Sequence, residues 1–273
     1  MPAIQPARLK IQILELAEKF SRPDEFRVAL NDLFFYYADR TRKSGRSRST
    51  YTLINSYNVP RQVMRQTERL LYPQVSVQPE MALSLADVLW KEKWLECRQL
   101  ALIILGWIPP NPPERIIQRV RAWGQGCKED RDLQEALVKG LARLRLEHTE
   151  LFFHLLESWL KSPDQADRLL GLRVIPPLVR EPDFQHLPRV FNLLSPIIQR
   201  VGVVPAPDIL RVVRVMAEES PQETAYFLHK SLVVSENTGV FVLIRQSLDA
   251  FPPQIRDELK VFLHQRREEF RGQ

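Results

Sequence analysis

The chain has 273 residues, of which 44% are hydrophobic and 26% are charged, a composition that is ordinary for a globular protein and excludes a disordered one. No apolar stretch reaches the roughly 18 residues of a membrane-spanning helix, and the N-terminal residues lack the apolar region of a secretory signal. The two cysteines, Cys97 and Cys127, form neither a disulfide framework nor a metal motif, so we expect a cytoplasmic protein in which both are small core residues.

The net charge of +6 is concentrated in the first quarter of the chain. Residues 1–72 hold 13 Lys/Arg against 7 Asp/Glu, whereas residues 73–273 hold 26 of each kind. This asymmetry indicates contact with a polyanion or with an acidic protein at the N-terminal end. A surface that only keeps the chain soluble is the alternative.

The first predicted elements are two amphipathic helices at residues 9–20 and 24–40, where apolar residues recur at i, i+3, i+4 and i+7. A loop follows, because glycine and serine interrupt the pattern there. The loop region contains five cations within nine positions: Arg40, Arg42, Lys43, Arg46 and Arg48.

The next predicted helix, at residues 60–71, extends the basic region. It carries Arg61, Arg65 and Arg69 at i, i+4 and i+8, a spacing that places all three on one helix face. We therefore predict that the loop and this face form one basic patch.

The later helices are predicted to come in pairs. Their second members begin at residues 95, 132, 166, 207 and 239, at spacings of 37, 34, 41 and 32 residues. A loose period of this size, with two helices per unit, is typical of HEAT-like arrays. We predict an all-α, HEAT-like α-solenoid of about seven helix pairs whose second helices line a concave groove. It would be a single domain, 1–273, with the N-terminal helices and basic loop at 1–48 and the helix-pair array at 49–273.

Motifs for catalysis are scarce. The sequence contains no glycine-rich phosphate loop and no HExxH or G-x-S-x-G pattern. His148, Glu150 and His154 are the nearest approach to a metal cluster, but the two histidines do not share a helix face. We therefore expect neither a metal nor a cofactor. Among the tryptophans, Trp123 lies just beyond a predicted helix, and we expect it to be exposed.

Several segments resemble the AlkD-like family of DNA alkylation-repair proteins. They are "SYNVPRQVMRQTERLL", "LADVLWKEKWLECRQLALIIL", "ESWLKSPDQADRLLGLRVIPPLVRE" and "LRVVRVMAEESPQETAYFLHKSL", which follow the family's order over roughly residues 50–250. The resemblance implies a HEAT-like superhelix whose positively charged concave groove binds duplex DNA.

The resemblance also implies positions for a catalytic carboxylate and for groove aromatics. The family's carboxylate falls on Gln134, with Asp132 and Asp130 as neighbouring candidates, and no tryptophan precedes it in that stretch. Arginines are expected to contact phosphate further along the chain, at positions where the family uses an arginine or an aromatic residue: Arg168, Arg211 and Arg214. Salt bridges of Arg168 with Asp167 and of Arg214 with Glu218 are the alternative for two of them.

These observations leave three hypotheses about function. The first is an AlkD-like HEAT-repeat protein that binds duplex DNA, damaged or distorted, without robust glycosylase activity. The second is an active alkylpurine DNA glycosylase that uses Asp132 or Asp130. The third is a HEAT-type scaffold for a protein partner. In each case we expect a monomer with no membrane contact.

Overall fold

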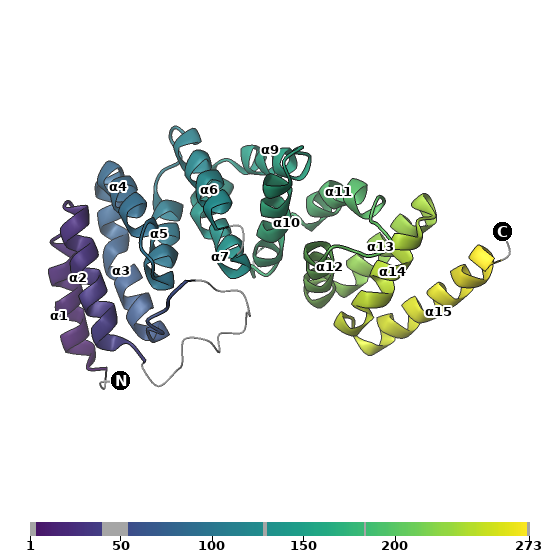
Figure 1. Cartoon of the computed structure of the whole chain (residues 1–273), viewed down its shortest axis with the longest axis horizontal. Coiled ribbons are helices and arrows are strands. Elements are labelled where there is room, and N and C mark those ends of the chain that lie inside the picture. Colours follow the sequence, from purple (N-terminus) through teal and green to yellow (C-terminus); the bar gives the residue numbers. More distant parts are fainter. Residues whose placement is uncertain (1–3, 40–53, 128–129, 183, 272–273) are drawn as a thin grey trace. The chain divides into compact units, whose positions relative to one another are not determined.

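The structure, a computed structural model, describes residues 4–39, 54–127, 130–182 and 184–271 and is all-helical over these ranges (Figure 1). The predicted all-α class is therefore confirmed. Within the described ranges the β contribution is a single isolated bridge between Asn55 and Trp94. No helix in these ranges is both long and apolar enough to cross a membrane.

The chain divides into two compact units, Met1–Leu156 and Glu157–Gln273. The helices up to the boundary, which falls within α9, are α1 (Pro6–Ala17), α2 (Pro23–Tyr37), α3 (Arg61–Val77), α4 (Pro79–Trp90), α5 (Leu95–Trp107), α6 (Glu114–Gly126), α7 (Arg131–Ala136), the 3₁₀ helix η1 (Leu137–Leu141), α8 (Ala142–Glu147) and α9 (Thr149–Leu160). The second unit continues with α10 (Gln165–Val179), α11 (Leu187–Ile198), α12 (Pro207–Glu219), α13 (Pro221–Ser235), α14 (Thr238–Ser247), the 3₁₀ helix η2 (Leu248–Ala250) and α15 (Pro253–Arg271).

Proline and short polar side chains set many of the helix starts. Seven helices (α1, α2, α4, α11, α12, α13 and α15) begin with proline in the first two positions, where the missing N–H has no helical partner to lose. Asp130, Asp164 and Asn237 cap α7, α10 and α14, each through a side-chain oxygen that accepts from a backbone N–H of the first turn. These caps satisfy donors that the helix itself leaves unpaired.

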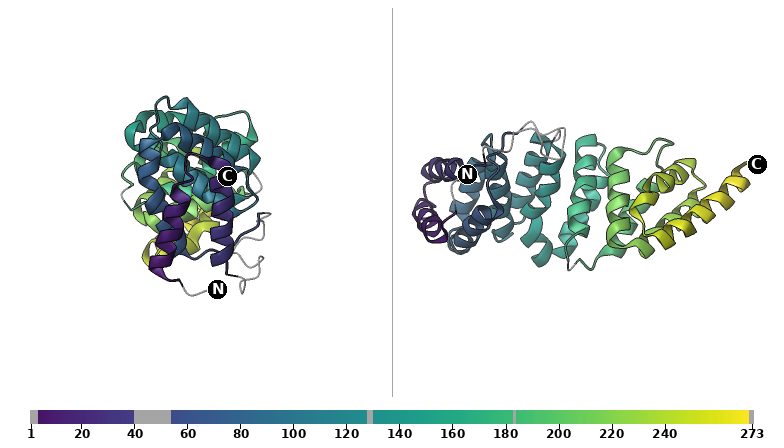
Figure 2. Two further views of the ribbon diagram at one scale, coloured as in Figure 1. Left: turned by 90° about the vertical axis from the view of Figure 1, so that its left-hand side faces the viewer. Right: turned by 90° about the horizontal axis from the view of Figure 1, so that it is seen from below.

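In the first unit, consecutive helices pack side by side. α1 contacts α2 and α3, and α4 lies against α5, which in turn packs against η1; Figure 2 shows α1 and α2 together at the N-terminal end. The core between α4 and α5 is made of small and branched apolar side chains such as Ala86, Leu89, Leu100 and Ala101, all fully buried. Both cysteines are buried, as predicted.

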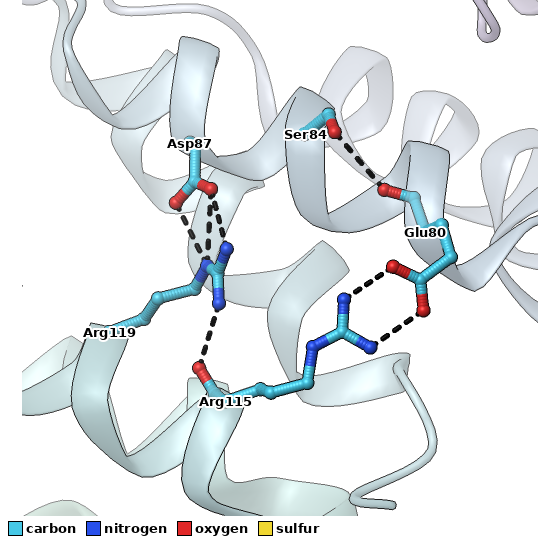
Figure 3. A network of polar contacts seen from close by, with 5 residues as sticks. All are labelled: Glu80, Ser84, Asp87, Arg115 and Arg119. Atoms are coloured by element: carbon cyan, nitrogen blue, oxygen red, sulfur yellow. Dashed lines mark hydrogen bonds and ion pairs between the residues drawn. The ribbon is translucent and has the colours of Figure 1, made fainter. Parts of the chain in front are cut away.

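Two arginines of α6 tie this helix to α4 (Figure 3). Arg119 Nε and Nη2 donate to the carboxylate of Asp87 at 2.8–3.2 Å. Arg115 pairs with both carboxylate oxygens of Glu80, and Arg119 also donates to the Arg115 carbonyl oxygen at 3.0 Å. A two-pronged guanidinium–carboxylate contact fixes orientation as well as distance, so these pairs set the register between the two helices.

The prediction that Trp123 is exposed is wrong. Its side chain is only 7% exposed, because its ring stacks on Trp90 of α4 with the ring centroids 4.5 Å apart and the planes within 7°. The guanidinium carbon of Arg98 lies 5.3 Å from the Trp90 ring centroid. These tryptophans therefore pack helices together and leave no ring at this place for a nucleobase.

The second unit is built around α12, which contacts α10, α13 and α14, and α15 closes it against α13 and α14. Arg173 of α10 pairs with Asp208 of α12 at 2.9 Å, with both side chains about nine-tenths buried. More exposed pairs continue along these helices, where Arg180 binds Glu218 at 2.7 Å and Arg214 binds Asp249.

Five ion pairs between neighbouring helical segments, two in the first unit and three in the second, join residues that lie a similar distance apart in the sequence, whereas Arg27 and Glu92 pair across 65 residues. Separations of 35 and 32 residues occur between α4 and α6, and separations of 35, 38 and 35 residues recur in the second unit. The helix-pair spacing predicted from the sequence was 32–41 residues. Each arginine therefore reaches a helix one predicted pair away.

Candidate nucleic-acid interface

A polar groove of about 1070 Å³ opens in the first unit beside α3 and α5. We call it the α3–α5 groove. Its walls come from α3, α5, η1 and the segment that leads into α3. The charged lining residues are three cations, Arg61, Arg65 and Lys139, and three carboxylates, Asp39, Glu68 and Glu96.

Glu96 builds one wall of the groove. Its carboxylate is buried and accepts hydrogen bonds from Ser56 Oγ at 2.7 Å, from Tyr57 N at 3.1 Å and from Val59 N at 3.3 Å. Asn58, between these donors, has a φ of 53°, in the left-handed region that asparagine tolerates better than most residues. The carboxylate thus holds an irregular segment in one conformation and fixes where α3 begins.

Tyr57 anchors the same segment from its other side. Its ring stacks on Trp94 with the centroids 3.8 Å apart, and its hydroxyl donates to Asn31 Oδ1 at 3.1 Å. The Asp39 N–H donates to the Tyr57 carbonyl oxygen at 3.1 Å. Asp39 itself lines the groove, so the described residues on both sides of 40–53 lie at the groove edge.

The predicted basic stripe of α3 is only partly at the groove. Arg61 and Arg65 are exposed and line it, whereas Arg69 is exposed on the same helix but is not among the lining residues. Within the described part of the chain, none of the three makes an ion pair or a side-chain hydrogen bond. Their donors are therefore available to an anionic ligand.

Lys139 reaches the groove through a close approach of η1 to α5. A Cβ atom at Gly106 of α5 would lie 1.9 Å from the Lys139 carbonyl oxygen, so any larger residue there would displace η1. Lys139 is itself exposed. It adds a third cation to the groove from an element distant in sequence.

Glu68 is a groove residue that the sequence did not single out. Burial raises the pKa of its carboxyl above the ordinary value, although Lys139 and Arg65 nearby lower it. Its spacing could have identified it as a groove residue, because Glu68 follows Arg65 by three residues and Arg61 by seven and so lies on the same face of α3. It is also the first acidic residue after Asp39.

The arginines of the second unit that were predicted to contact phosphate all interact with other groups of the protein. Arg168 is exposed, and its Nη1 donates to the carbonyl oxygens of Ser162 and Pro163, both at 2.7 Å. Arg214 pairs with Asp249, and the alternative pairing with Glu218 is wrong, because Glu218 binds Arg180. Arg211 is partly buried on α12. As DNA contacts, Arg168, Arg211 and Arg214 stay predictions.

The region of the expected catalytic carboxylate has a structural role. Gln134 is buried, and its Nε2 donates to the Gly124 carbonyl oxygen at 2.7 Å. Asp130 is buried as well and caps α7 by accepting from Leu133 N at 3.0 Å. Asp132 lies in α7, but its side chain is outside the described part of the structure.

The cations of the predicted basic loop also lie outside the described residues: Arg40, Arg42, Lys43, Arg46 and Arg48. The described residues bring together no group of three metal-binding side chains.

Fold and groove together describe an all-helical protein with cations gathered along a polar groove of its first unit. The sequence model of a family described as DNA alkylation repair enzyme matches residues 35–199, which is more than half of the chain and includes every residue that lines the groove. The chain belongs to this family, and its function is thereby tied to DNA repair. No curated protein and no solved structure matches it.

Proposed function

We propose that the protein binds duplex DNA, damaged or distorted, through the α3–α5 groove and the basic residues of segment 40–48. The observation that carries this proposal is the pair Arg61 and Arg65, two exposed cations that form no ion pair or side-chain hydrogen bond with the residues the structure describes and that line a groove within the family match. On this proposal the helices form one HEAT-like array of about seven pairs, and the protein acts as a cytoplasmic monomer without robust glycosylase activity.

The exposed charges of the groove favour a phosphate backbone over a neutral ligand. Its three cations are exposed, whereas the Glu96 carboxylate is buried and already accepts three hydrogen bonds, and Asp39 and Glu68 are partly buried. Arg61, Arg65 and Lys139 come from two elements and line the same groove. They would therefore neutralise several phosphates of a strand that follows the groove. Such contacts position a duplex without selecting its sequence. The described residues on both sides of segment 40–53 lie at the groove edge, and this segment contains the five cations of the predicted basic loop.

The direct test is the salt dependence of binding to a fluorescent duplex. We expect the affinity to fall steeply with salt, and we expect the slope of log affinity against log salt to decrease by about one for each neutralised phosphate contact. Replacing Arg42, Lys43, Arg46 and Arg48 together by alanine should lower both the affinity and this slope. Absence of duplex binding by the unmodified protein at low salt would refute the proposal.

A second candidate function, removal of alkylated purines, is favoured by Glu68. Its partly buried carboxyl lies in the groove beside Arg65 and Lys139. An ionised carboxylate there could stabilise the positive charge that develops on a deoxyribose as its bond to a purine breaks. Asp130 is less suited to this role, because it is committed to the α7 cap.

Release of 7-methylguanine from methylated duplex DNA tests this candidate. If the protein is a glycosylase that uses Glu68, Glu68→Gln should abolish the release and leave duplex binding in place. Loss of release in Asp132→Asn alone would instead assign the role to Asp132. If the unmodified protein binds the methylated duplex and releases no base, binding without catalysis is the function.

A further inference from the structure

A second groove, of about 970 Å³, lies in the C-terminal unit between α13 and α15. We call it the α13–α15 groove. Its floor is apolar, with Ala225 of α13 and Ile255, Leu259 and Phe262 of α15 among the lining residues. No lining residue of this groove belongs to the α3–α5 groove, so the two sites can be tested separately.

Aromatic rings stand along the α13–α15 groove. The His229 ring lies on Phe262 with the centroids 4.0 Å apart, and Tyr226 lines the groove while remaining 70% exposed. About two turns further along α13, apolar exposure continues at Val233 and Val234, which are 39% and 63% exposed. An exposed apolar strip beside a groove is typical of a surface that a partner covers.

The charge of the groove is of one sign. Its ionised side chains are the carboxylates of Glu219, Glu223 and Glu258, and no lysine or arginine is among the lining residues that the structure describes. Glu219 lies 3.6 Å from Arg180. Glu223 and Glu258 have no ion-pair partner among the described residues, and they come from the two opposite walls, α13 and α15.

We propose that the α13–α15 groove docks a basic, partly apolar segment of a partner protein. Arginine or lysine side chains would pair with Glu223 and Glu258 across the groove, apolar side chains would cover Ile255 and Leu259, and a guanidinium could lie on the exposed ring of Tyr226. The same carboxylates repel a phosphate backbone, which excludes DNA as the occupant. The proposal is independent of DNA binding by the first unit.

The probe is a short fluorescent peptide that alternates arginine and leucine, with a matched peptide in which citrulline, an uncharged isostere, replaces arginine. We expect the arginine peptide to bind, and the citrulline peptide to bind at least about tenfold more weakly. Glu223→Lys with Glu258→Lys should abolish binding, and Tyr226→Ala should weaken it. Duplex binding should be unchanged or stronger in all these variants.

The control pair is Glu15→Lys with Glu18→Lys, because both glutamates are exposed, Glu15 on α1 and Glu18 just after it, and the pair changes the net charge equally. Equal loss of peptide binding in the control and in the groove variant would overturn the proposal, since attraction by net charge would then explain it. Glu223→Gln with Glu258→Gln provides a milder version should the lysine variant fail to fold. Self-association of the protein that the groove variant abolishes would also overturn the proposal, by making a second copy the occupant.

Discussion

The two units put their arginines to different uses. On α3 of the first unit, Arg61 and Arg65 extend into the groove without a partner among the described residues, whereas Arg173, Arg180 and Arg214 of the second unit pair with carboxylates of neighbouring helices. The first unit also contains arginines that pair with carboxylates of another helix, namely Arg115 and Arg119 of α6 (Figure 3). Arginine content alone therefore does not locate a nucleic-acid surface.

The largest effect should come from breaking the buried pair of the second unit. Asp208→Ala removes a buried carboxylate that pairs with Arg173, which we expect to lower the free energy of unfolding by about 3 kcal/mol. Guanidinium-induced unfolding followed by circular dichroism measures this change. The matched control is Asp249→Ala, which removes the partner of Arg214 at an exposed site and should cost about 1 kcal/mol or less. Equal losses in the two variants would contradict the assignment of Arg173 to the core.

The comparison predicts opposite outcomes for two arginine pairs in DNA binding. Arg61→Ala with Arg65→Ala should reduce the salt slope of duplex binding by about two and leave the free energy of unfolding nearly unchanged. Arg168→Ala with Arg214→Ala should leave the salt slope unchanged, because both side chains already have protein partners. Measurements on the same duplex over one salt series check both. A loss of slope in the second pair would extend the DNA surface to the second unit.

A smaller effect is expected at Glu68, whose raised pKa makes it sensitive to pH. The folded protein holds this proton more tightly than the unfolded chain, so stability should fall as pH rises from the ordinary glutamate pKa through the raised one. Glu68→Gln should therefore stabilise the protein at neutral pH and have no effect at acidic pH below both values. It should also strengthen duplex binding by about threefold at neutral pH, since one carboxylate leaves the groove. Thermal unfolding and duplex titrations across pH measure the two effects.

The smallest effect concerns the thiols. Cys97 and Cys127 are buried, and burial raises the pKa of the Cys97 thiol, so neither should react with a thiol reagent in the native protein. Absorbance of the released chromophore should show no reaction until denaturant is added. Rapid labelling of Cys97 in buffer would mean that the contacts of α5 with α4 open readily, against the packing described above.

The helical class could be predicted because it depends on local apolar periodicity, and the recurrence of ion pairs at 32–38 residues matches the predicted spacing. The sequence did not locate features that depend on a distant partner. Trp123 follows a helical pattern and precedes glycine, which favours exposure, yet Trp90 of another helix covers it. The burial of Glu68 and its proximity to Lys139 depend on how α3, α5 and η1 pack, which periodicity along one helix does not encode.

For the arginines, the sequence predicted the helix face correctly in one case and the ion-pair partner wrongly in another. Arg61 and Arg65 were found from their spacing on one helix face, and that face lines the groove. The partner of Arg214 was misassigned because a contact four residues away on its own helix was preferred over Asp249, 35 residues away. Sequence patterns identify the face on which a charge lies more readily than the residue that neutralises it.

The clamp that Glu96 forms on residues 56–59 has a consequence for how this protein can evolve. Because the clamp, the Tyr57–Trp94 stack and the Asp39–Tyr57 hydrogen bond fix both flanks of segment 40–53, insertions or deletions within the segment need not disturb α3. Loop-closure entropy changes by only about 0.6 kcal/mol for each doubling of loop length. On the proposed function, descendants of this chain could therefore lengthen, shorten or recharge the segment and change the affinity for nucleic acid while the helical framework stays the same.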